Sequence, residues 1–227
     1  RARGVMIPAS KATKYAGFDL SKSSVAVQGF GNVGSVGAQL IAELGAKVVA
    51  VTDWRGGVYN AKGLDIPALI EYTAAHKTVD GFAGAERISN HEFFALPVDV
   101  LVPAAIENQI TKDNMRGIQA KVIVEGANGP TTPEAHKHLH ERGVLIVPDI
   151  LANSGGVTTS YFEWVQDRYG YFWTEKEVNE RLEAKMMEAF NAVIKTAQRY
   201  DVDMRTAAYI VAISRVAAVV RVRGMYA

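Results

Sequence analysis

Short apolar runs alternate with segments of helical periodicity over the first two thirds of the chain. The runs are rich in valine and isoleucine and short enough to be buried strands. They cover residues 25–28, 47–51, 98–102, 121–125 and 144–147. The helical pattern falls on residues 10–16, 33–44, 65–76, 111–116 and 133–142. Polar, glycine-bearing stretches at 54–63 and 78–90 predict loops.

This alternation of strands and helices is typical of a mostly parallel sheet covered by helices. We therefore expect a Rossmann-like, doubly wound α/β fold. The last third differs, because three long helical patterns follow one another with no strand between them; they cover residues 157–169, 175–199 and 204–223. The expected organisation is one domain over residues 1–227, with a helical tail from about residue 157.

Three glycines follow the first predicted strand at G-x-G-x-x-G spacing: Gly29, Gly31 and Gly34. In a dinucleotide site, Gly29 allows a tight turn, Gly31 lets the backbone approach a pyrophosphate, and Gly34 lets helix and strand pack closely. Asp53 ends the second strand, where a carboxylate can accept the adenosine ribose hydroxyls. The alternative is a glycine-rich turn that binds nothing. The complete strand–turn–helix–strand–Asp unit favours a nucleotide site.

Composition narrows the function classes. Apolar residues make up 48% of the chain and charged residues 22%, which indicates a soluble globular protein. The net charge of +1 gives no reason to expect nucleic acid. The absence of cysteine excludes disulfides, cysteine-based zinc sites and thiol catalysis. No apolar run reaches the roughly 18 residues of a membrane span and no signal peptide is visible, so we expect no membrane partner and a cytoplasmic location.

Three other groups of residues receive structural interpretations. His136, His138 and His140 fan around a helix, so we expect no metal site there. The aromatic residues between 161 and 173 indicate packing, or a surface that meets another domain. Five arginines are interpreted as solvated faces or domain contacts: Arg199, Arg205, Arg215, Arg221 and Arg223.

Several longer motifs resemble the glutamate dehydrogenases. The resemblance rests on GFGNVG with Asp53, PAAIENQI at 103–110, EGANGPTTPEA at 125–135, PDILANSGGVTTSYFEW at 148–164, and the ending MRTAAYIVAISRVAAVVRVRGMYA. The related leucine, valine and phenylalanine dehydrogenases share the glycine turn but normally lack GPTT after EGAN. Only the nucleotide-binding domain of this family is matched. The catalytic lysine and aspartate belong to a preceding domain, which we expect to be absent here, so no catalytic residue is assigned and the isolated chain is expected to be inactive.

The resemblance also implies roles for single residues. The expected cofactor-binding residues are Gly29, Phe30, Gly31, Asn32, Val33, Gly34, Asp53, Ala104, Ala105, Asn128 and Asn153. Among them, Ala104 and Ala105 would flank a cofactor ribose, and Asn128 and Asn153 would hold the nicotinamide end. Ser160 would donate to the side-chain carboxylate of glutamate, with Val157 shaping that pocket.

Some of these positions have other interpretations. Asn128 and Asn153 could each cap a turn beside a glycine or proline, and Ser160 could bond back to a helix carbonyl. Arg1 stands where the family has the threonine of TGRG, which puts a cofactor contact by that threonine in question.

The implied activity is oxidative deamination of L-glutamate to 2-oxoglutarate and ammonium. Asp53 would repel a 2′-phosphate and so favours NAD, although Arg55 could accommodate NADP. A full-length protein of this family would be a homo-hexamer, whereas the isolated domain could be monomeric. Two alternatives remain open: another amino-acid dehydrogenase of the family, and a nucleotide-binding module without catalysis.

Overall fold

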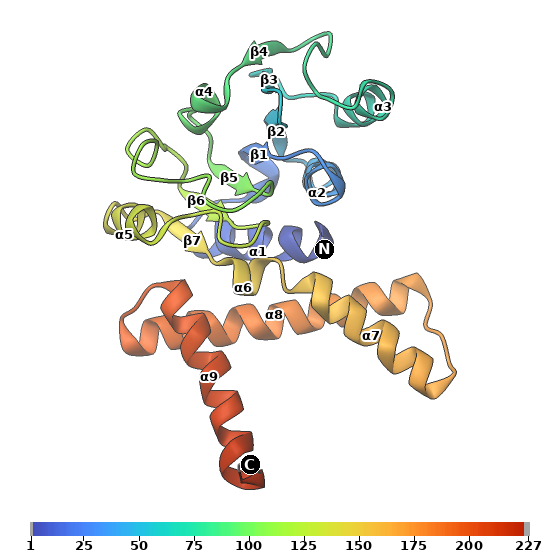
Figure 1. Cartoon of the computed structure of the whole chain (residues 1–227), viewed down its shortest axis with the longest axis vertical. Coiled ribbons are helices and arrows are strands. Elements are labelled where there is room, and N and C mark those ends of the chain that lie inside the picture. Colours follow the sequence, from blue (N-terminus) through green and yellow to red (C-terminus); the bar gives the residue numbers. More distant parts are fainter. Residues whose placement is uncertain (1, 225–227) are drawn as a thin grey trace.

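The computed structural model describes residues 2–224, and Arg1 lies outside the described residues. Seven strands form one sheet in the order β4-β3-β2-β1-β5-β6-β7 (Figure 1). They are β1 (Ser24–Gln28), β2 (Lys47–Thr52), β3 (Gly57–Tyr59), β4 (Glu86–Ile88), β5 (Val100–Pro103), β6 (Val122–Val124) and β7 (Leu145–Val147). The α-helices are α1 (Ala2–Tyr15), α2 (Asn32–Glu43), α3 (Ile66–His76), α4 (Asn90–Phe94), α5 (Pro133–Glu141), α6 (Asp149–Ala152), α7 (Gly155–Tyr169), α8 (Glu175–Tyr200) and α9 (Met204–Arg223).

The strand order confirms the Rossmann-like, mostly parallel sheet. β1 pairs in parallel with β2 on one side and with β5 on the other. The chain builds the sheet outward from β1 to β4, then returns to the other side of β1 and continues to β7. The carboxyl ends of β1 and β5 therefore flank a topological switch point, where ligands of open α/β sheets bind.

Successive side chains of β1 point to opposite faces of the sheet and belong to two separate hydrophobic cores. Val25 and Val27 of β1 belong to a core shared with α1, α2 and α8, whereas Ala26 belongs to a core shared with α4 and α5. Both faces of β1 are thus covered, because its neighbouring side chains point to opposite sides of the sheet. This explains why the predicted strands are continuous apolar runs.

The edge strands β3 and β4 correct the expected loops at 54–63 and 78–90. Both pair antiparallel, β3 with β2 and β4 with β3. Each is three residues long, which is shorter than the apolar runs from which strands are predicted. Gly57 is needed for packing, since a Cβ there would lie 2.7 Å from the Thr52 Cγ2 atom. A glycine that indicates a loop in the sequence is therefore part of the sheet.

Two helix predictions also need correction. The expected helix at 111–116 is a series of turns, because the Asn114 side chain accepts from the Thr111 N–H and donates to the Gln109 carbonyl. The expected helix at 10–16 begins much earlier, as α1. Gly4 and Pro8 indicate a break, but Gly4 lies against Gly155 of α7; a Cβ at Gly4 would be 2.7 Å from the Gly155 Cα. Tertiary packing thus outweighs local propensity.

The three long C-terminal helices confirm the predicted helical tail. The N-terminal part of α9 packs on β7 and α8, and its C-terminal part projects away from the sheet (Figure 1). Its outer part exposes Ile213, Val216 and Val222, and the aromatic block exposes Tyr171 and Phe172. Over residues 2–224, no helix is both long and apolar enough to cross a membrane.

Candidate functional site

The glycine turn follows β1 at the switch point of the sheet. Gly29 has φ +86°, a conformation that favours glycine, and a Cβ there would lie 2.9 Å from the Ala105 Cα. Gly34 lies against the same turn, because a Cβ there would be 1.8 Å from the Gly29 carbonyl oxygen. The tasks predicted for Gly29 and Gly34, a tight turn and close helix packing, are both visible in the structure.

Gly31 is different, because no internal contact requires it to be glycine. It is the N-cap of α2, with φ −79° and ψ −165°, and nothing lies within 4 Å of the position its Cβ would take. Among the described residues, no side chain caps this helix N-terminus. The open space and the first-turn N–H groups together provide what a phosphate group needs.

The other predicted residues of the turn point in different directions. Phe30 is buried in the core, so only its backbone is available to a ligand. Asn32 is exposed at the start of α2, and Val33 borders a cleft. The sequence could assign these positions to the turn but could not assign the direction of each side chain.

Asp53 follows β2 directly, and two backbone N–H groups fix its carboxylate. Oδ1 accepts from Arg55 N at 2.8 Å and Oδ2 accepts from Val79 N at 2.7 Å. Each oxygen keeps a free lone pair, so the carboxylate is held in place and can still accept hydroxyl groups. The Arg55 guanidinium lies 4.7 Å from the centroid of the exposed Trp54 ring.

A cleft of about 400 Å³ opens beside the glycine turn. Six predicted site residues meet there: Val33, Ala104, Ala105, Asn128, Asn153 and Val157. Ile106, Glu107, Gly126 and Ala127 complete its lining. The backbone ties the walls together, because Gly126 N and Ala127 N both donate to the Pro103 carbonyl at 3.0 Å. Ile106 and Glu107 lie in the motif at 103–110, but no local pattern in the sequence marks either side chain as a ligand contact.

The side chains of Asn128 and Asn153 are bonded to each other in the lining of the cleft. Asn153 Nδ2 donates to Asn128 Oδ1 at 2.6 Å. This pairing leaves the N–H₂ group of one amide and the oxygen of the other unbonded, whichever way the two amides are oriented. Asn153 is also the C-cap residue of α6. The interpretation of Asn153 as a turn-capping residue therefore holds for its backbone, and its side chain is not used for the cap.

Ser160 and Val157 lie on α7, and only Val157 lines the cleft. The Ser160 hydroxyl donates to the Gly156 carbonyl at 3.3 Å, on an exposed face of the helix. The bond back to a helix carbonyl is therefore present, and it is long enough to exchange for another acceptor.

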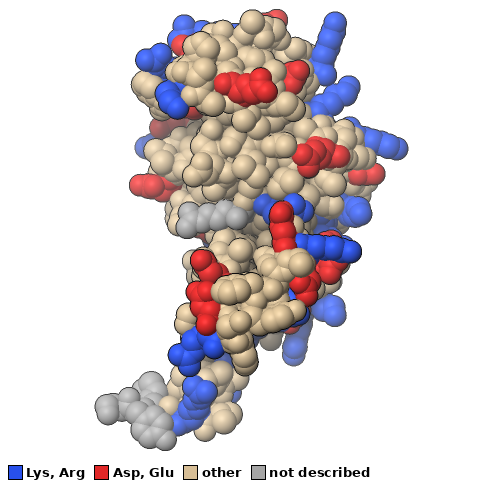
Figure 2. Space-filling view, turned by 90° about the vertical axis from the view of Figure 1, so that its right-hand side faces the viewer, with Lys and Arg blue, Asp and Glu red and all other residues tan. Residues whose placement is uncertain are grey.

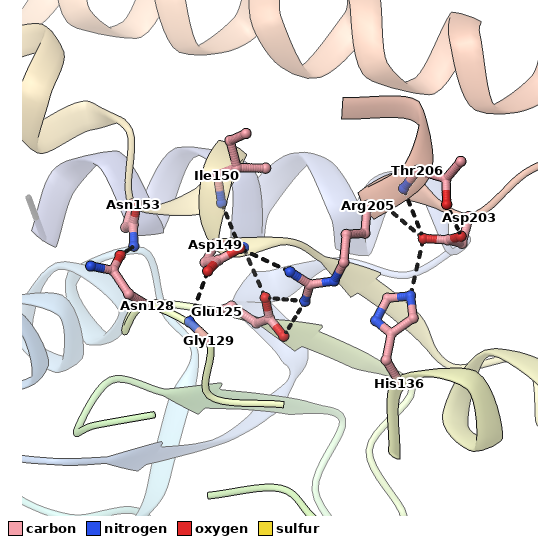
Figure 3. A network of polar contacts seen from close by, with 10 residues as sticks. All are labelled: Glu125, Asn128, Gly129, His136, Asp149, Ile150, Asn153, Asp203, Arg205 and Thr206. Carbon is pink, nitrogen blue, oxygen red and sulfur yellow. Dashed lines mark hydrogen bonds and ion pairs between the residues drawn. The ribbon is translucent and has the colours of Figure 1, made fainter. Parts of the chain in front are cut away.

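A buried ion network lies behind the cleft, and it includes Arg205 (Figure 3). Arg205 Nη2 donates to both carboxylate oxygens of Glu125, at 2.7 and 2.5 Å, and Nη1 donates to Asp149 Oδ1 at 2.9 Å. Glu125 is fully buried. The prediction that Arg205 belongs to a solvated face or a domain contact is wrong, since its side chain is 22% exposed and pairs with residues 56 and 80 positions away.

Burial and neighbouring charges shift the pKa values of three titrating groups in and beside this network. Burial alone would lower the pKa of Arg205, but Glu125 and Asp149 outweigh it and raise the pKa. Burial, followed by the charge of Arg205, lowers the pKa of His136, so its imidazole is neutral at pH 7. Burial would raise the pKa of Asp203, but hydrogen bonds from Thr206 and His136 lower it to about 2.

Charges outside this network are mixed. On the face shown in Figure 2, lysine and arginine are interspersed with aspartate and glutamate, without a continuous stripe of one sign. His136 pairs with Asp203 at 3.0 Å instead of converging with His138 and His140. Within residues 2–224, no three histidine, aspartate or glutamate side chains are grouped as a metal site would require.

The parallel sheet, the glycine turn at its switch point and the cleft beside it define a Rossmann-like α/β protein. Comparison with known families is more specific, since the model of the Glutamate/Leucine/Phenylalanine/Valine dehydrogenase family matches residues 1–224. The chain belongs to this family.

Several glutamate dehydrogenases are among the proteins similar to this chain. A glutamate dehydrogenase of Thermotoga maritima is 56% identical over 99% of this chain and 54% of its own length. An NAD-specific glutamate dehydrogenase of Staphylococcus aureus is 49% identical over 98% of the chain and 54% of its own length. The solved hetero-hexameric glutamate dehydrogenase of Thermus thermophilus superposes with a TM-score of 0.94 at 36% identity, over 100% of this chain and 55% of that one. The chain thus spans about half the length of the relatives it matches.

Proposed function

We propose that this chain is the dinucleotide-binding half of an NAD-dependent glutamate dehydrogenase. The observation that carries the proposal is Gly31, a glycine with no internal packing role at an uncapped helix N-terminus, beside a cleft that holds six predicted site residues. The N–H groups and the dipole at the first turn of α2 would hold the pyrophosphate, because both favour an anion.

The two ends of the cofactor match two further features. The Asp53 carboxylate, already fixed by two N–H groups, accepts the adenosine ribose hydroxyls and disfavours a 2′-phosphate. The paired amides of Asn128 and Asn153 keep one N–H₂ group and one oxygen unbonded, which complement the nicotinamide carboxamide. The name of the Staphylococcus aureus relative supports NAD as the cofactor. Because Arg55 lies two residues beyond Asp53, NADP remains the second candidate.

The reaction is oxidative deamination of L-glutamate. A bound nicotinamide would supply the acceptor for the hydride of the substrate α-carbon. Hydrolysis of the resulting iminium by water would then give 2-oxoglutarate and ammonium. This chain orients the nicotinamide with Asn128 and Asn153 and contributes one wall of the substrate pocket with Val157. Ser160 exchanges its bond to Gly156 for one to the substrate's side-chain carboxylate.

Residues 1–227 act as one dinucleotide-binding domain, and a preceding domain supplies the catalytic lysine and aspartate. The exposed aromatic and aliphatic residues of α7 and α9 suit contact with such a domain. The full-length protein is a homo-hexamer; the hexameric relative of Thermus thermophilus supports the number of subunits, though that assembly is hetero-hexameric. A cytoplasmic location stays a prediction.

Enzyme assays test the proposal in two parts. The 227-residue chain binds NAD and does not reduce it in the presence of glutamate, whereas the full-length protein reduces NAD with glutamate faster than with leucine, valine or phenylalanine. A preference for one of those three amino acids would make it another dehydrogenase of the family. Glutamate-dependent reduction by the 227 residues alone, at an enzyme-like rate, would contradict the assignment of catalysis to a preceding domain.

A further inference from the structure

The ion network behind the cleft joins parts of the chain that are distant in sequence. Arg205 lies in the first turn of α9, Glu125 follows β6, and Asp149 begins α6. The single guanidinium bonds both carboxylates. Arg205 is itself placed by Asp203, the N-cap of α9, which accepts from the Arg205 N–H at 2.9 Å.

From Asp149 the network continues to both amides of the cleft. Asp149 Oδ1 faces Arg205, and Oδ2 accepts from the Gly129 N–H at 2.8 Å, the residue that directly follows Asn128. On the other side, Asp149 begins the one-turn helix α6 that ends at Asn153, whose N–H donates to the Asp149 carbonyl at 3.0 Å. Figure 3 shows the Asp149 carboxylate bonded to the Gly129 N–H beside Asn128, while the Asn153 branch starts from the main chain of the same residue.

We propose that Arg205 is a positioning residue that sets the Asn128–Asn153 amide pair for the nicotinamide carboxamide through Glu125 and Asp149. This inference rests on the proposed function. Arg205 does not line the cleft, so it acts only through the carboxylates it holds. Without Arg205, two neighbouring carboxylates, one of them fully buried, lose their shared cation and cannot keep their positions.

Lysine cannot replace arginine here. The guanidinium donates from two nitrogens in a fixed plane, one to each carboxylate, whereas an ammonium is a point charge on a flexible stem. Arg205→Lys therefore keeps the charge and loses part of the geometry, and Arg205→Gln loses both. Asp149→Asn leaves Arg205 in place but replaces one carboxylate oxygen with an N–H₂ group. Arg205 and the Gly129 N–H donate to different oxygens of Asp149, and an N–H₂ group cannot accept from either, so one branch of the network is broken.

The test compares NAD with ADP-ribose, which lacks the nicotinamide. Calorimetry on the purified protein gives the affinity for each ligand, and urea unfolding gives the stability of each variant. Arg205→Gln and Asp149→Asn should lower the affinity for NAD at least about fivefold, since two hydrogen bonds at the nicotinamide end are lost. The affinity for ADP-ribose should fall less than about twofold. Arg205→Lys should fall between wild type and Arg205→Gln.

Arg142→Gln is the matched control. Arg142 also holds distant segments together, donating to the Met115 and Ile118 carbonyls, but these segments do not reach the cleft. Its loss should lower stability and leave the ratio of the two affinities unchanged. Equal weakening of NAD and ADP-ribose by Arg205→Lys and Asp149→Asn, or no change in either, would overturn the positioning role alone. Wild-type protein that binds neither ligand would overturn the proposed function as well.

Discussion

Gly31→Val is the most informative single substitution, because the structure separates its effect on the fold from its effect on a ligand. The backbone at Gly31 is extended and its Cβ position is open, so valine enters without a clash. Valine is a poorer N-cap than glycine, which costs about 1 kcal/mol or less. The same side chain fills the space in front of the first-turn N–H groups of α2.

The cost to the ligand is larger than the cost to the fold. A hydrogen bond from an N–H group to a charged phosphate contributes about 1.5–3 kcal/mol. Loss of one such bond weakens NAD roughly tenfold to a hundredfold. Calorimetry with NAD gives the affinity, and thermal unfolding shows whether the variant is folded.

Gly37→Ala in the same helix is the control. Nothing lies within 4 Å of its Cβ position either, and alanine in a helix interior stabilises by up to about 1 kcal/mol. It should bind NAD as the wild type does. A folded Gly31→Val protein that retains wild-type affinity would show that the turn has only a structural role.

Three further predictions concern the cofactor, the substrate and pH. Asp53→Ser should lower the affinity for NAD and reduce the difference between the NAD and NADP affinities in parallel titrations. An unmutated chain that binds NADP more tightly would make Arg55 the residue to test. In full-length protein, Ser160→Ala should raise KM for glutamate, because a hydrogen bond to a charged group contributes about 1.5–3 kcal/mol to binding. Norvaline turnover should not change; equal losses of activity with both substrates would mean that Ser160 serves only the fold. In the folded chain, burial and then the charge of Arg205 lower the pKa of His136 from 6.5. Below pH 6.5 the unfolded chain therefore binds more protons at His136 than the folded chain does, and the free energy of unfolding falls as the pH drops. His136→Gln should flatten the urea-unfolding profile between pH 7 and 5, and an unchanged slope would refute this cause. The lowered pKa of Asp203, about 2 against 3.8, adds a loss of stability between those two values as pH falls further.

The central part of the fold and site could be predicted because its signals are local. The glycine turn, the two strands beside it and Asp53 lie within 30 consecutive residues, and each residue type follows from the backbone it must adopt. The sequence also predicts the start of α3 from a local signal, the N-cap Asp65, whose side chain accepts from Ala68 N in the structure.

The remainder depends on contacts between distant residues. β3 and β4 gain their strand character from pairing at the sheet edge, and α1 begins early because Gly4 packs on Gly155. Arg205 resembles the other C-terminal arginines in sequence, and only the fold places it between Glu125 and Asp149. No periodicity in α9 distinguishes it from a solvated arginine.

The most direct test of the central claim is a crystal structure of the chain with NAD bound. We predict the pyrophosphate at the N–H groups of the first turn of α2, the adenosine ribose on Asp53, and the carboxamide between Asn128 and Asn153. A dinucleotide bound elsewhere on the protein, or one whose pyrophosphate does not contact the glycine turn, would contradict the account.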